Sequence, residues 1–82
     1  MSNNARLEWR CRRGTKELDL LLQTWLRQEF DLSAEADRQA FLELLEWSDD
    51  ELTHLLLGTH QSDQTRINEL ARKIRSLSLH LT

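Results

Sequence analysis

Apolar residues recur along this chain at intervals of three and four positions, which is the spacing of one face of an α-helix. The clearest stripe lies within residues 15–30 and consists of Leu18, Leu21, Leu22, Trp25 and Leu26. It predicts an amphipathic helix whose apolar side is buried. A later stripe consists of Ile67, Leu70, Ala71, Ile74 and Leu77. It predicts a last helix, which we expect Ser62 to cap.

Two shorter helices fit between these stripes. Ser33 is a candidate N-cap for a helix over residues 34–46, because acidic residues follow it in the first turn. The segment Ser48-Asp49-Asp50-Glu51 matches the capping box, in which a serine and a glutamate each bond the other's backbone amide. The helix that starts there should end near residue 57, where Gly58 would supply the left-handed conformation that commonly stops a helix.

The N-terminal pattern is weaker but still helical. Residues 6–13 would place Leu7, Arg10 and Cys11 on one side of two turns, and Gly14 would end that helix. Alternating strand patterns are absent and the connections are short. We therefore predict an all-α fold, a compact bundle of about five short helices with mostly antiparallel neighbours, forming a single domain over residues 1–82.

The 82 residues carry a net charge of −3 that is unevenly distributed. The first sixteen residues contain five basic side chains and one acidic one, Glu8. Residues 29–63 reverse this balance, with ten acidic side chains and a single basic one, Arg38. The molecule should therefore have a basic end and an acidic end. A chain of this size buries only about 60–65% of its surface, so we expect its function on the outside.

Several classes of function are not expected from this composition. No apolar run reaches the roughly 18 residues of a membrane span, and no signal-peptide core follows the N-terminus, so we predict a cytoplasmic protein without membrane insertion. The single cysteine and the three dispersed histidines do not predict a metal site. The acidic helices should repel a phosphate backbone, so we expect no nucleic-acid partner.

The polar side chains do not form a pattern that predicts catalysis. Asp49 and Asp50 follow a capping serine, where acidic groups stabilise a helix N-terminus. His54 has no neighbouring nucleophile in its helix. Among the tryptophans, Trp25 lies on the buried stripe, whereas Trp9 falls opposite Leu7 and could serve the core or a partner surface equally well.

The segment from Arg12 to Asp19 groups charges of both signs around a glycine between two helices. One interpretation is structural: Gly14 is an N-cap and Glu17 stabilises the third position of the next helix. The other is functional: a glycine lets a partner backbone approach, while Arg13 can make a bidentate contact with a partner carboxylate. The residues alone favour neither.

This segment resembles the signature of a known family, the small succinate dehydrogenase assembly factors that promote covalent flavin attachment. Their motif Arg-Gly-x-x-Glu is matched by Arg13-Gly14-Thr15-Lys16-Glu17, and a leucine run follows it. A later acidic turn that ends in Leu-x-Gly is also similar, so the resemblance covers roughly the whole chain. Thr15 departs from the family, which usually has a hydrophobic residue after the glycine.

The resemblance implies a chaperone rather than an enzyme. Its client would be the flavoprotein subunit of succinate dehydrogenase or of fumarate reductase, in which FAD becomes linked to a client histidine. The chain itself would hold no cofactor stably and would be a monomer when alone. The expected partner-binding residues, with Trp9 added from its position, are Arg13, Gly14, Glu17, Arg12, Lys16, Asp19 and Trp9. The alternative is an antitoxin-like regulatory protein that uses the same surface on another partner.

Overall fold

The computed structural model of the chain describes residues 4–58 and 60–80, and the described part contains helices and no strand. Five α-helices and one 3-10 turn follow one another as α1 (Asn4–Arg10), α2 (Lys16–Gln28), η1 (Phe30–Leu32), α3 (Glu35–Leu44), α4 (Asp49–Leu56) and α5 (Thr65–His80). The predicted all-α class is therefore confirmed. None of the helices in these ranges has the length and apolar character needed to cross a membrane.

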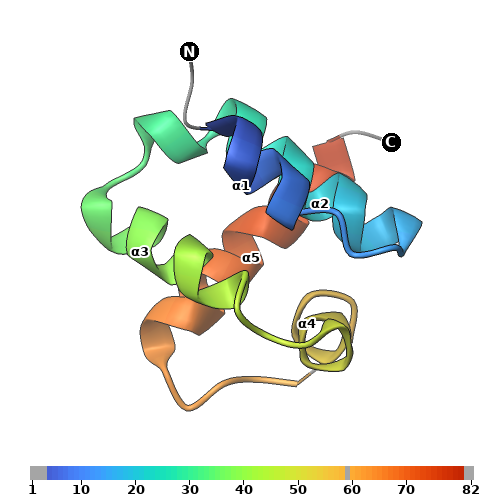
Figure 1. Cartoon of the computed structure of the whole chain (residues 1–82). Helices are drawn as coiled ribbons and strands as arrows, with labels where there is room; N and C mark the ends of the chain where they lie inside the picture. Colours follow the sequence, from blue (N-terminus) through green and yellow to red (C-terminus); the bar gives the residue numbers. More distant parts are fainter. Residues whose placement is uncertain (1–3, 59, 81–82) are drawn as a thin grey trace.

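Helix α5 lies at the centre of the fold and packs against α2, α3 and α4 (Figure 1). The two apolar stripes meet there: Leu18 and Leu22 of α2 and Leu70 and Ile74 of α5 are all completely buried. Their burial is the main stabilising contribution, at about 1.5–3 kcal/mol for each large apolar side chain. This burial fixes α2 and α5 to a common core.

An aromatic cluster closes one end of this core. Trp25 is only 2% exposed, which confirms its predicted place in the core. Its ring centroid lies 4.7 Å from that of Phe41 and 5.9 Å from that of Phe30. The short turn η1, which was not predicted, brings Phe30 to this cluster.

The insertion of η1 also changes how α3 begins. The helix predicted over residues 15–30 ends at Gln28, and α3 starts at Glu35 with Ala34 as its N-cap. The prediction of Ser33 as the cap is therefore wrong. Its hydroxyl instead donates a hydrogen bond of 2.6 Å back to the Glu29 carbonyl, which holds η1 in place.

The capping box at the start of α4 is confirmed. The Glu51 amide donates to the Ser48 hydroxyl at 3.1 Å, and the Ser48 amide donates to the Glu51 carboxylate at 3.2 Å. The predicted role of Gly58 is wrong, because in the described part only Gly14 has a positive φ. A Cβ at Gly58 would lie 2.9 Å from the His54 carbonyl oxygen, so close backbone approach explains this glycine.

The last helix begins later than predicted. Helix α5 starts at Thr65, so Ser62 precedes it by several residues instead of capping it directly. The Ser62 hydroxyl accepts from the Gln64 amide at 3.1 Å. The Asn68 side chain bonds both the amide and the carbonyl of Ser62, at 2.8 and 2.9 Å, and so holds the connector against the helix.

Candidate functional site

The candidate site is the connection between α1 and α2, which contains the Arg-Gly-x-x-Glu sequence. Gly14 has a φ of +89°, a conformation that L side chains rarely adopt, and nothing lies within 4 Å of where its Cβ would be. The glycine is therefore required by the backbone turn and not by a lack of internal space. The open space beside it faces solvent.

The turn is fixed by its own residues. The Arg13 amide donates a 2.5 Å hydrogen bond to the Asp19 carboxylate, which comes from the first turn of α2. The N-cap of α2 is Thr15, with extended backbone and no side-chain cap bond. The structural interpretation that placed Gly14 at the N-cap is therefore wrong, and Glu17 lies one position closer to the start of the helix than that interpretation required.

Arg13 turns inward and joins this connection to the segment between α3 and α4. Its Nη1 donates to the Trp47 carbonyl at 3.0 Å and approaches the Asp49 carboxylate at 3.5 Å, and its Nη2 donates to the Leu45 carbonyl. Carbonyls just after a helix have no intrahelical donor, so this guanidinium satisfies them. The Arg13 side chain is only 15% exposed.

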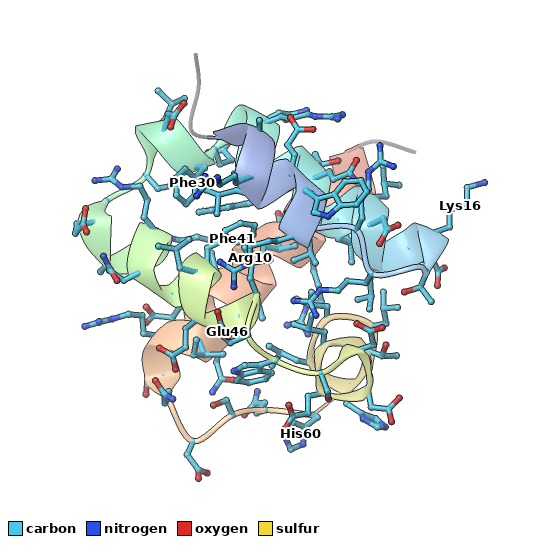
Figure 2. The ribbon with its side chains drawn as sticks, viewed as in Figure 1. Arg10, Lys16, Phe30, Phe41, Glu46 and His60 are labelled. Atoms are coloured by element: carbon cyan, nitrogen blue, oxygen red, sulfur yellow. The ribbon has the colours of Figure 1, made fainter. Side chains whose placement is uncertain are left out.

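This placement differs from the expected bidentate contact between Arg13 and a partner. Both terminal nitrogens of Arg13 already bond within the chain, and its Nε is buried without a protein hydrogen-bond partner. Asp19 is also partly buried. The exposed members of the predicted set are Trp9, Arg12, Gly14, Lys16 and Glu17. In Figure 2 the Lys16 side chain extends away from the body of the molecule.

Helix α1 lies beside this loop and is clamped on two sides. Glu8 accepts two hydrogen bonds from Arg27 of α2, at 2.8 and 3.2 Å. Arg10 forms an ion pair with Glu46, which follows α3 (Figure 2). The hydrogen bond from Arg27 holds the pKa of the Glu8 carboxyl below its ordinary value. These pairs fix the orientation of a helix too short to be stable alone.

Cys11 completes the attachment of α1 to the core. The residue is fully buried, and this burial raises the pKa of its thiol to about 12. Only the thiolate is a strong nucleophile, so Cys11 acts as a small core residue and not as a reactive group. Among the described residues, histidine, cysteine, aspartate and glutamate side chains form no group of three or more that could hold a metal ion.

Sequence reasoning missed one exposed apolar residue near the loop. Leu20 is 52% exposed and lies one helical turn beyond Glu17, on the same side of α2. The exposure of Leu20 could have been predicted from the sequence, because Leu20 does not belong to the buried apolar stripe of its helix. An exposed leucine beside charged residues is a common form of contact surface.

The fold and site together define a small helical protein with an exposed charged loop between α1 and α2. The family described as flavinator of succinate dehydrogenase matches residues 5–78. The chain is 36% identical over 77 residues to the FAD assembly factor SdhE of Methylococcus capsulatus, covering 94% of this chain and 93% of that protein. It is 32% identical over 76 residues to the SdhE of Yersinia pestis, covering 93% and 86%. The chain belongs to this family of FAD assembly factors of succinate dehydrogenase.

Proposed function

We propose that this chain binds the flavoprotein subunit of succinate dehydrogenase and promotes the covalent attachment of FAD to it. The observation that carries the proposal is the Arg-Gly-x-x-Glu turn, in which Gly14, Lys16 and Glu17 are exposed while Arg13 and Asp19 hold the backbone in place. A preorganised loop loses little entropy on binding. We extend the proposal to the flavoprotein subunit of fumarate reductase, the second client that the resemblance implied.

In this proposal the motif residues have two kinds of role. Gly14 leaves open space in which a client backbone can lie close to the turn, and Lys16 and Glu17 offer charges of both signs beside it. Arg13 and Asp19 position the turn from inside. Arg13 therefore acts through the loop conformation, and Arg12 is the arginine of the motif region that is free to reach a client.

The chain promotes the reaction without supplying a reacting group of its own. FAD becomes attached to the client, and this chain has no Gly-x-Gly-x-x-Gly phosphate loop with which to bind it independently. Cys11, its only thiol, is buried with a raised pKa and cannot attack a flavin. Holding the client so that its histidine is oriented against the flavin supplies a rate gain through proximity alone. We propose that the chain does this as a cytoplasmic monomer.

A pull-down tests the partner. Affinity-tagged chain is expressed in its host cells beside the Gly14→Arg variant, and the captured proteins are identified by mass spectrometry. The proposal predicts that wild-type chain captures the flavoprotein subunit and that Gly14→Arg captures much less. Capture of a toxin or a cytoskeletal protein in place of the flavoprotein would support the antitoxin-like alternative and contradict the proposal.

A further inference from the structure

Trp9 is the largest exposed apolar side chain in the described part of the molecule, with 71% of its surface accessible. We infer that Trp9, together with Arg6 and Arg12, forms a second contact surface that binds an acidic segment of the client carrying an apolar side chain. This inference rests on the proposed function. It adds an anchoring residue and a partner chemistry to the surface formed by the Arg-Gly-x-x-Glu turn.

The structure holds Trp9 outward by fixing the residues on both sides of it. Glu8 is bonded to Arg27 of α2, and Arg10 is paired with Glu46 beyond α3. Both neighbours are thus tied to other elements by surface ion pairs, and the indole between them projects to solvent. A tryptophan presented in this way loses little freedom when a partner covers it.

The immediate surroundings of Trp9 suit a mixed apolar and acidic ligand. The guanidinium carbon of Arg12 lies 5.6 Å from the centroid of the indole, within the range of a cation–π interaction. Ala5, Arg6, Trp9 and Arg10 line a hollow on the same side of α1. Tryptophan and arginine are the residue types most enriched among interface hot spots.

Charge decides which partner fits this surface. Arg6, Arg12 and Lys16 are exposed, and none of the ion pairs within the described residues involves them. The excess of acidic side chains lies elsewhere, over residues 29–63. Acidic groups on a partner would be attracted to Arg6, Arg12 and Lys16 and repelled by the acidic side chains of residues 29–63, which helps to orient the encounter.

The surface around Trp9 continues into the motif loop. Arg12 contacts the indole on one side and directly precedes the Arg13-Gly14 turn on the other. A single client segment can therefore lie along α1 and reach the turn. This continuity favours one protein partner that covers both features.

The test measures the dissociation constant of the purified chain and the purified flavoprotein subunit for wild type and four variants. Loss of a tryptophan hot spot costs at least about 2 kcal/mol, so Trp9→Ala should weaken binding about 30-fold. Trp9→Phe keeps an aromatic ring and should recover most of that loss. Leu32→Ala is the matched control, because Leu32 is 82% exposed and lies on η1, and it should bind as wild type does.

Trp9 makes few internal contacts, so Trp9→Ala should unfold at nearly the wild-type temperature. Arg12→Gln should reduce the salt dependence of binding, because it removes a charge from the contact. In a chain labelled with 5-fluorotryptophan, the ¹⁹F resonance of Trp9, assigned from Trp9→Phe, should shift when the client is added. The resonance of the buried Trp25 should shift much less.

The outcomes separate this inference from the function on which it rests. Failure of wild-type chain to bind the flavoprotein would overturn both. Wild-type binding that Trp9→Ala leaves unchanged would overturn only the second contact surface. A Trp9 resonance that responds to vesicles of phosphatidylglycerol and phosphatidylcholine, or to duplex DNA, but not to the client would also overturn it.

Discussion

Replacement of Gly14 separates the stability of the loop from its contact with a client. A non-glycine residue in the left-handed region costs about 1–2 kcal/mol. Loss of glycine's freedom in the unfolded chain offsets about 0.4–1 kcal/mol of this. The φ of Gly14 is +89°, and no atom lies within 4 Å of where its Cβ would be. Gly14→Ala should therefore lower the free energy of unfolding by about 1 kcal/mol through backbone strain alone, and Gly14→Arg should lower it by the same amount. A loss of that size lowers the melting temperature by about 4–8 °C in a domain of this length.

The two variants differ only in what they present to a partner. The alanine methyl occupies little of the open space beside the turn, whereas the arginine side chain fills it. We expect both variants to melt together in thermal unfolding followed by circular dichroism. When co-expressed with the client, Gly14→Ala should retain most of the covalent flavin fluorescence of the denatured client band, and Gly14→Arg should lose most of it.

Two results would refute this reasoning. A melting temperature for Gly14→Arg far below that of Gly14→Ala would show that the side chain meets the fold and not the solvent. Equal flavin incorporation with the two variants would show that no client approaches the turn. Gly14→Asn, which tolerates the left-handed region, should melt closest to wild type and serves as the control for backbone strain.

Substitutions at four further positions test other parts of the structure. Leu22→Ala should cost about 2–5 kcal/mol in urea unfolding, because it leaves a cavity in the core; a loss below that range would contradict the packing. Ser48→Ala should cost about 1 kcal/mol through loss of the capping box, and a neutral result would show that the cap does not contribute. Arg13→Ala should lower the free energy of unfolding by about 1–3 kcal/mol, because it leaves the Leu45 and Trp47 carbonyls unpaired. Arg13→Lys should recover only part of this loss, since one ammonium group cannot reach both carbonyls. Full recovery by lysine would show that the guanidinium is not needed. The pKa of Cys11 is raised from 9.0 to about 12 in the fold, so its contribution to stability is complete below pH 9.0 and is lost as the pH rises towards 12, and Cys11→Ala should remove this part of the pH dependence.

Much of the fold could be predicted because the apolar stripes of α2 and α5 are long and regular. The Ser48 capping box could also be recognised, because it uses only residues that are close in the sequence. The turn η1 could not, since it depends on Phe30 packing against Trp25 and Phe41, which is a tertiary contact. Ser33 failed as a cap for the same reason.

The sequence predicted that the Arg12–Asp19 segment joins two helices, but not the direction of its side chains. The sequence places Arg12 and Arg13 side by side and gives no means of telling which is internal. The distinction arises 32 and 34 residues further on, where the carbonyls of Leu45 and Trp47 accept hydrogen bonds from Arg13. The left-handed turn at Gly14 could be anticipated, because a glycine between two helical patterns commonly adopts it.

Flavin attachment in a purified system tests the central claim most directly. The flavoprotein subunit is prepared without covalent flavin and incubated with FAD, with or without equimolar chain. Covalent flavin is then followed by fluorescence of the subunit on a denaturing gel. The account predicts that covalent flavin accumulates faster and to a higher level when the chain is present. Equal rates and equal yields in the two samples would contradict it.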